Sequence, residues 1–189
     1  MTVPLALDLA TLPAALVGAG SPLLKRLRLL DGESVPNLIV YAPDPDETLL
    51  EAAGARLLPR LPDDAEIASL RVLFVAGLQA DISAALASVA RIHRVLVNVE
   101  DNPPLCDFHV PAILRRGDLA LSISTGGASP TLSRRVRTHL EREFPEDWSD
   151  RIQRVATLRQ KLRAEGASPV MVMEATDALI DGEGWFKFR

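Results

Sequence analysis

Hydrophobic positions along the chain alternate between short apolar runs and longer stretches with helical spacing. Four of the runs predict buried strands, over residues 14–17, 37–43, 72–77 and 94–99. After the first run, leucines recur at positions 23, 24, 27 and 30, which predicts a helix with Ser21 as N-cap and Pro22 in its first turn. A second helix is expected over 81–91. Strands that alternate with helices are typical of an α/β fold with a parallel sheet.

The pattern changes near residue 104. Residues 108–125 indicate two strands joined by a turn at 116–118, which is the pattern of a hairpin. Two amphipathic helices follow, one carrying Leu132, Val136 and Leu140, the other running from Ile152 to near Gly166. A break at 143–148 separates them, a last short helix begins at 168–169, and 182–189 form a tail. We expect three parts, bounded at 1–105, 106–145 and 146–189.

Composition narrows the class of protein. The chain has 189 residues, of which 48% are hydrophobic, as in a folded globular protein. A net charge of −4 argues against a nucleic-acid-binding protein. Cys106 is the single cysteine, and Cys/His spacing of the metal-finger type is absent, so we assign no metal ligands. No apolar run reaches the length of a membrane span, and the first residues lack the basic start of a signal peptide. We expect a cytoplasmic protein.

A glycine loop links the first strand to its helix, through Gly18, Ala19, Gly20, Ser21 and Pro22. In a dinucleotide-binding turn the first glycine permits the turn, the second admits the pyrophosphate, and a third small residue lets the helix pack closely. Leu23 occupies the third position, where we expect it to push the helix outward. At the end of the second strand, NAD enzymes often place an acidic residue that holds the ribose hydroxyls; here Pro43 is followed by Asp44, which comes slightly later than that position and could serve the same role. A plain glycine-rich corner is the alternative.

A longer motif lies between residues 98 and 134. It reads Asn-Val-x-Asp, then Phe-x-x-Pro-Ala-Ile, then Thr-Gly-Gly-x-Ser-Pro-x-Leu-Ser-Arg, with Asn98 and Asp101 at its start and Arg134 at its end. In this motif the chain resembles the precorrin-2 dehydrogenase/sirohydrochlorin ferrochelatase family, which includes the N-terminal half of siroheme synthase. Upstream the resemblance is looser: the family's Arg-Lys pair corresponds to Lys25-Arg26, and its acidic turn is replaced by Gly77-Leu78-Gln79.

The resemblance implies a fold and an activity. The family uses NAD to oxidise precorrin-2 to sirohydrochlorin, and many members then insert ferrous iron. Its fold has a Rossmann-like NAD-binding domain, expected here at 1–105, a dimerisation and tetrapyrrole-binding region at 106–145, and a helical C-terminal part. The active site lies in a cleft shared across a homodimer. The partners expected are therefore a tetrapyrrole and a second copy, without nucleic acid or membrane.

Asp101 matches the family aspartate that acts as general base or acid. It follows a strand at the edge where open α/β sheets bind ligands, and a carboxylate there could accept the protons that oxidation or metal insertion releases. The alternative is an aspartate that caps the turn before Asn102. Asn98 could equally bind the ligand or fix the turn, whereas Cys106 is expected to pack and Glu100 to be solvated. His109 could transfer protons or contact iron, or serve structure alone.

The second glycine loop, in the stretch SISTGGASPTLSRR, opens another helix. The tetrapyrrole carries eight carboxylates, and free backbone amides at a helix amino end favour anions. We expect this loop and the helix after it to bind those carboxylates through Ser124, Thr125, Gly126, Gly127, Ser129 and Arg134. Arg115, Arg116, Arg135 and Arg137 could add positive charge. The alternative is that the arginines are solvated or pair with Glu141 and Glu143.

The sequence is compatible with three functions. The first is a precorrin-2 dehydrogenase, either bifunctional or limited to the oxidation. The second is a relative with impaired NAD binding that acts only as a chelatase or tetrapyrrole-binding protein, which Leu23 and the missing acidic turn motivate. The third is an NAD-binding regulatory domain, against which Asp101 and the second glycine loop argue.

Overall fold

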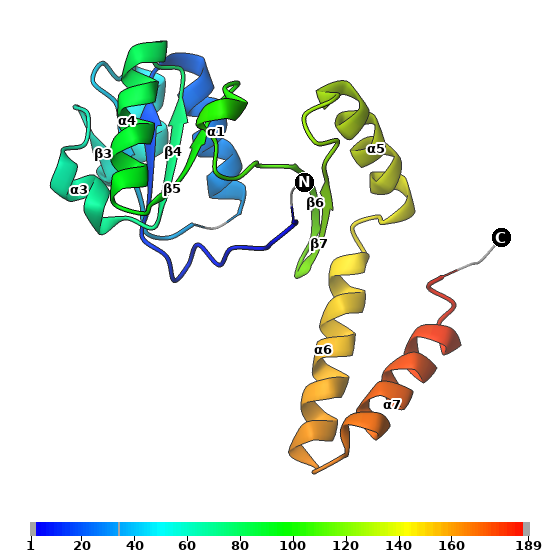
Figure 1. The fold of residues 1–189 in the computed structure, drawn as a ribbon. Helices are drawn as coiled ribbons and strands as arrows, with labels where there is room; N and C mark the ends of the chain where they lie inside the picture. Colours follow the sequence, from blue (N-terminus) through cyan, green and yellow to red (C-terminus); the bar gives the residue numbers. More distant parts are fainter. Residues whose placement is uncertain (1–2, 34, 187–189) are drawn as a thin grey trace. The chain divides into compact units, whose positions relative to one another are not determined.

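The computed structural model describes residues 3–33 and 35–186. By its internal contacts the chain divides into two compact units, Met1–Val110 and Pro111–Arg189 (Figure 1). The predicted boundary at 105 lies five residues before this division. The separate roles expected for 106–145 and 146–189 stay predictions.

The first unit is an α/β domain around a five-stranded parallel sheet with strand order β3-β2-β1-β4-β5. Its strands are β1 Ala14–Gly18, β2 Leu38–Tyr41, β3 Leu57–Leu58, β4 Val72–Ala76 and β5 Leu96–Val99. Its α-helices are α1 Gly20–Gly32, α2 Glu47–Ala53, α3 Asp64–Ser69 and α4 Ala80–Ile92, and short 3-10 turns lie at Gly54–Arg56 and Pro103–Leu105. All four predicted strands and both predicted helices are confirmed. The elements without a prediction are short, so they carry little periodicity.

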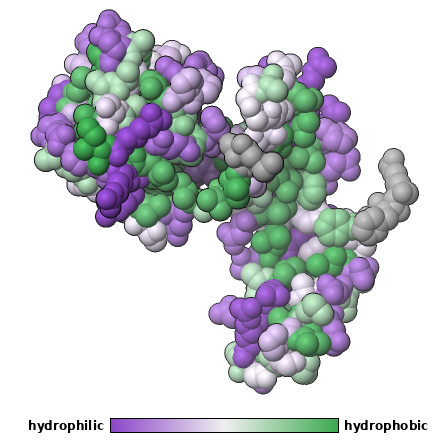
Figure 2. Space-filling view, viewed as in Figure 1, coloured by the Kyte–Doolittle hydropathy of each residue, from purple (hydrophilic) through white to green (hydrophobic). Residues whose placement is uncertain are grey.

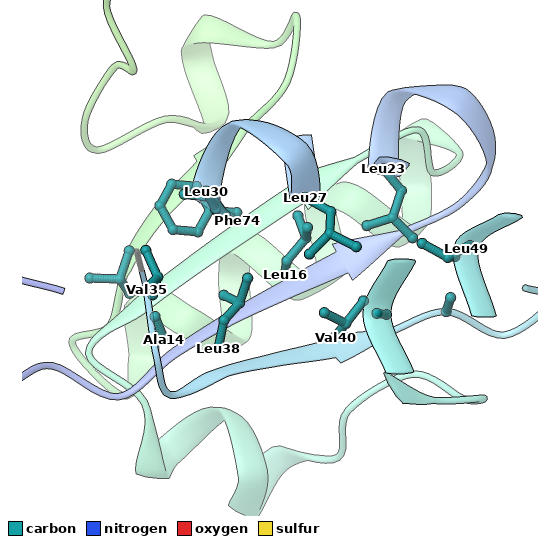
Figure 3. Packing of buried hydrophobic residues seen from close by; sticks show 13 residues of the cluster. Ala14, Leu16, Leu23, Leu27, Leu30, Val35, Leu38, Val40, Leu49 and Phe74 are labelled. Carbon is teal, nitrogen blue, oxygen red and sulfur yellow. The ribbon is translucent and has the colours of Figure 1, made fainter. Parts of the chain in front are cut away.

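Apolar side chains pack on both faces of this sheet. Toward α1, a cluster joins Leu16, Leu38 and Phe74 of the strands to Leu23 and Leu27 of the helix (Figure 3). Toward α4, a second cluster is built from the strand residues that alternate with the first, including Val17, Leu73, Val75 and Val97. Because β1 and β4 are covered on both faces, all their residues are buried, and they read as continuous apolar runs.

Helix α1 begins two residues earlier than the sequence predicts. Its N-cap is Ala19, in an extended conformation, and Gly20 is its first residue. The expectation that Ser21 caps the helix is therefore wrong, whereas Pro22 does lie in the first turn. Gly20 has a φ of 60°, a left-handed conformation that a residue without a Cβ adopts easily. The chain can thus turn into the helix at Gly20, before Ser21 is reached.

The second unit begins with an antiparallel hairpin, β6 Ala112–Arg116 and β7 Leu119–Ile123, as predicted. Three helices follow: α5 Pro130–Glu143, α6 Trp148–Ala164 and α7 Pro169–Gly182. The last helix, expected to be short, has 14 residues. Trp148 is buried, and the rings of Phe144, Trp185 and Phe186 surround it. Part of the predicted tail thus packs on Trp148, and its residues 187–189 lie outside the described residues.

Across residues 3–33 and 35–186, no helix has the length and apolar character that crossing a membrane requires.

Candidate active site

The two turns that follow β1 and β4 lie in close contact. A Cβ added to Gly18 would stand 2.0 Å from the carbonyl oxygen of Ala76, and one added to Gly77 would stand 2.3 Å from that of Ala19. The Ala19 amide donates to the Ala76 oxygen at 3.1 Å. Gly18 is therefore required by the neighbouring strand, as the first glycine of a dinucleotide turn is expected to permit a tight corner. Gly77 closes the other side of the corner.

The amino end of α1 is open. Ala19 supplies no side-chain cap, and the first turn holds no acidic residue. Within the described residues, the amides of Gly20 and Ser21 donate to no backbone or side-chain acceptor, and both residues are exposed. By contrast, Asp46 and Asp63 cap α2 and α3 with their carboxylates. Unpaired amides on the positive end of a 13-residue helix fit the pyrophosphate of a dinucleotide.

Leu23 does not leave the core. Its side chain is fully buried in the cluster beneath α1 (Figure 3). Its Cδ1 would lie only 3.1 Å from a Cβ on Gly18, so the glycine provides the space that the leucine fills. The structure therefore accommodates the departure from a small third residue, and Leu23 by itself gives no reason to expect impaired NAD binding.

Pro43 and Asp44 follow β2 at the same edge of the sheet, and both are exposed. No hydrogen bond or ion pair engages the Asp44 carboxylate in the described part of the chain, which leaves it available for ribose hydroxyls. Just before them, Tyr41 is buried, with Arg60 5.7 Å from its ring centroid. Burial raises the pKa of Tyr41, and the negative charge of Glu66 raises it further.

Asp101 follows β5 in a turn that the Asn102 amide closes on the Val99 oxygen at 3.3 Å. Its φ is 56°, a left-handed conformation that aspartate adopts more readily than most residues. The side chain is exposed and accepts no hydrogen bond from any described residue, so it does not cap the turn. Because the strands are parallel, Asp101 lies at the same edge of the sheet as the glycine loop after β1.

Residues 106–108 cover the free edge of β5. Cys106 Sγ donates to the Val99 oxygen at 3.1 Å and accepts from its amide, and Asp107 exchanges hydrogen bonds with Val97. Asn98 is 6% exposed, and its Nδ2 donates to the Phe108 oxygen at 2.9 Å. Cys106 is thus in packing contact, as expected, and the Asn98 amide group fixes the segment. A direct contact of Asn98 with substrate stays a prediction.

Glu100 and Arg26 form a pair that the sequence did not indicate. Arg26 Nη2 lies 3.8 Å from Glu100 Oε1, and the two side chains are 12% and 21% exposed. The expectation that Glu100 is solvated is therefore wrong, because the helix places a cation beside it. Burial lowers the pKa of Arg26, and the charge of Glu100 opposes that shift. The one sequence feature that could have indicated this pair is the position of Arg26, a basic residue next to the buried stripe of α1.

In the second unit, the glycine loop forms largely through its own side chains. Thr125 Oγ1 accepts from the Ser129 amide at 3.1 Å, Ser129 Oγ from the Leu132 amide at 3.1 Å, and Ser124 Oγ from the Gly126 amide at 3.2 Å. Gly126 and Gly127 have φ values of 61° and 84°. Fewer amides are therefore free than the sequence suggests.

Several amides in and next to this loop remain available. Among the described residues, those of Ser124, Thr125, Gly127 and Thr131 donate to no acceptor. Ser129 is the N-cap here and Pro130 the first helical residue, whereas in the first loop Ser21 and Pro22 lie inside the helix. The two stretches with glycines and Ser-Pro are therefore alike in sequence and differ in register at the helix start.

The arginines near the second loop divide into two kinds. Arg134 and Arg135 are exposed, with no ion pair to any described residue, so they are available to an anionic ligand. Arg137 lies 3.6 Å from Glu141, and Arg116 donates to the Phe144 oxygen at 2.8 Å. These two arginines therefore already have partners within the second unit. His109 is exposed, and its ring makes no hydrogen bond or ion pair with any described residue.

Comparisons with known proteins decide the family. A family model described as "Putative NAD(P)-binding" matches residues 5–112, and one described as "Sirohaem biosynthesis protein central" matches residues 116–143. Siroheme synthase from Methylococcus capsulatus is 34% identical over 164 residues, which are 85% of this chain and 34% of that protein. The chain belongs to the siroheme synthase family. Its first unit carries that family's NAD(P)-binding domain.

Further siroheme synthases give the same picture. Those of Pseudoalteromonas atlantica and Pseudomonas putida are 28% and 34% identical, over 95% and 78% of this chain. The chain spans about a third of the length of the curated relatives it matches. A solved structure titled "SirC, precorrin-2 dehydrogenase" superposes with a TM-score of 0.78 at 22% identity, covering 99% of this chain and 93% of that one. The predicted α/β fold is thereby confirmed.

Proposed function

We propose that this chain oxidises precorrin-2 to sirohydrochlorin with NAD as the acceptor. The observation that carries the proposal is the placement of an exposed, unpaired carboxylate, Asp101, at the sheet edge that also holds the open amino end of α1. The names of the siroheme synthase relatives and of the structural neighbour support the substrate.

Oxidation of a tetrapyrrole carbon–carbon bond removes a hydride and a proton. Bound NAD supplies the hydride acceptor. The Gly20 and Ser21 amides hold its pyrophosphate, and Asp44 holds ribose hydroxyls. Asp101 takes the proton, because its carboxylate is exposed and accepts no hydrogen bond within the described chain. The loop at 124–129, with Arg134, binds the carboxylates of the substrate, and Asn98 and His109 are assigned to the same role.

Insertion of ferrous iron is a second activity that the same carboxylate supports. Chelation releases two protons from pyrrole nitrogens, and Asp101 could accept them in turn. The described residues contain no group of three His, Cys, Asp or Glu side chains that could hold a metal ion, so iron enters this proposal as a substrate. The alternative, a chelatase or tetrapyrrole-binding protein that does not use NAD, rests on the loss of an acidic turn at Gly77-Leu78-Gln79.

We also propose that the protein forms a homodimer and that it acts in the cytoplasm. Helix α5 has no buried residue in the single chain, and Leu132 is 51% exposed on it. Further apolar residues lie at the surface of the second unit (Figure 2), including Val170, Met171 and Met173 of α7. Exposed apolar surface of this kind is typical of a protein–protein interface.

The test is to incubate the purified protein with precorrin-2 and NAD and to follow sirohydrochlorin by its absorbance. The proposal expects NAD-dependent product. Binding of sirohydrochlorin without NAD-dependent product would instead establish the alternative. Adding ferrous or cobaltous ion to the product tests chelation separately, and sedimentation analysis tests the dimer.

A further inference from the structure

Arg26 is a largely buried cation that makes no hydrogen bond to any described residue. Its nearest acidic group, Glu100 Oε1, is 3.8 Å from Nη2, beyond hydrogen-bond distance. Nη1 is buried, and no acceptor of the described chain lies within reach of it. A guanidinium offers five N–H donors in a planar fork, and burial of such donors without acceptors is costly. Buried polar groups in native proteins are paired with very few exceptions, so this one calls for an explanation.

The surroundings of Arg26 place it at the proposed site. It extends from α1, the helix whose open amino end faces the dinucleotide, to the turn after β5. The negative charges that act on it are those of Glu100 and Asp101. Asp101 is the proposed proton acceptor, and Glu100 precedes it in the same turn. Arg26 therefore carries positive charge beside the carboxyl end of β5, the edge at which open α/β sheets bind their ligands.

We propose that Arg26 is an oxyanion-binding residue of this site, and that Glu100 holds its guanidinium in place for a ligand carboxylate or phosphate. The inference rests on the proposed function for the identity of the ligand, and on the unpaired donors for the role. A carboxylate or phosphate accepts two parallel N–H bonds from a guanidinium. The oxyanion has two possible sources, the pyrophosphate of the dinucleotide and the carboxylates of the tetrapyrrole.

The experiment measures ligand affinity and thermal unfolding in the full chain. The variants are Arg26→Gln, which removes the charge, Arg26→Lys, which keeps the charge without the fork, and Glu100→Gln, which removes the holding group. Arg28→Gln is the matched control, because Arg28 is exposed on the same helix and has no ion pair with any described residue. The ligands are NAD and sirohydrochlorin, and the probes inorganic pyrophosphate and citrate.

Arg26→Gln should weaken binding of one ligand by about tenfold or more, because a hydrogen bond to a charged group contributes that much. A loss confined to NAD and pyrophosphate identifies the phosphate source, and one confined to sirohydrochlorin and citrate identifies the carboxylate source. Arg26→Lys should fall between wild type and Arg26→Gln, and Glu100→Gln should weaken the same ligand. Arg28→Gln should bind as wild type does.

Unchanged affinity of Arg26→Gln for both ligands and both probes, with a lower Tm, would show that Arg26 serves only the structure and would overturn the proposal. If instead the proposed function is wrong, the wild type binds neither NAD nor sirohydrochlorin. Pyrophosphate and citrate then still decide the role of Arg26. Stabilisation of the wild type by pyrophosphate or citrate that is lost in Arg26→Gln supports oxyanion binding, and equal stabilisation or none in both refutes it.

Discussion

Replacement of Asp101 separates its chemical role from its conformational one. With a φ of 56°, position 101 lies in the left-handed region, which costs an ordinary L-residue roughly 1–2 kcal/mol. Aspartate and asparagine tolerate it because their short polar side chains hydrogen-bond locally, and glycine because it has no Cβ. Asp101→Asn should therefore keep the free energy of unfolding within about 0.5 kcal/mol of wild type, as for other surface substitutions.

The same substitution should remove nearly all turnover. A positioned general base contributes roughly 10²–10⁴ in rate, which corresponds to about 3–5 kcal/mol of transition-state stabilisation. Asp101→Asn should thus lower kcat/KM for precorrin-2 oxidation by that factor and leave NAD affinity unchanged. Asp101→Ala should lose the same activity and about 1 kcal/mol of stability in addition, because the left-handed conformation brings the alanine Cβ close to the following carbonyl oxygen. Asp101→Gly should also lose activity, although glycine adopts the left-handed conformation of this turn without strain.

Sirohydrochlorin formation by absorbance, NAD binding by fluorescence titration and thermal unfolding give the three quantities. Full turnover in Asp101→Asn would refute the assignment of Asp101 as the base. A loss of activity in Asp101→Ala that Asp101→Asn or Asp101→Gly restores would show that the turn conformation matters and the carboxylate does not.

Three further predictions concern the framework of the site. Gly18→Ala should lower the free energy of unfolding by about 2–4 kcal/mol in urea titrations, because a Cβ 2.0 Å from the Ala76 oxygen forces β1 and β4 apart. Gly126→Ala is the control: a Cβ there meets open space, so the substitution should cost only about 1 kcal/mol. Ser129→Ala should lower the Tm by removing the N-cap of α5, at a cost of about 1 kcal/mol, and equal Tm values would show that the cap contributes nothing. The hydrogen bonds from Arg60 lower the pKa of Glu66 from 4.5 to about 2. The ionised Glu66 therefore stabilises the folded state above pH 4.5, and this stabilisation is lost as the pH falls toward 2. The Tm difference between wild type and Glu66→Gln should shrink over that range.

The local order of elements could be predicted from the sequence. Strands buried on both faces appear as unbroken apolar runs, and helices that face a core repeat leucines every three or four residues, so both leave a signal in adjacent positions. The four predicted strands, the hairpin at 116–118 and the helices after it follow from such signals. The motif between Asn98 and Arg134 added the family, because a set of residue types at fixed spacing is specific even when its structure is unknown.

The start of α1 shows where this reasoning fails. Ser21-Pro22 is a good helix start by local preference, and the same pair in the second loop, Ser129-Pro130, does start its helix. In the first loop the β1–β4 corner decides, because Gly18 must fit against the Ala76 oxygen and the chain then turns at Gly20. The strand that sets this condition lies more than fifty residues away along the chain, so no local pattern contains it.

Tertiary structure alone decided how the polar groups of the candidate site are used. The sequence determined that Asn98, Glu100 and Asp101 lie together at the carboxyl end of β5, and the resemblance assigned Asp101 the catalytic role, but the contacts of the three side chains could not be read from the sequence. Folding leaves the Asp101 carboxylate exposed and unpaired among the described residues, turns the Asn98 amide to Phe108, and places Arg26 beside Glu100. These differences arise because hydrogen bonds and ion pairs depend on distances between segments brought together by packing, and one-dimensional spacing does not encode those distances.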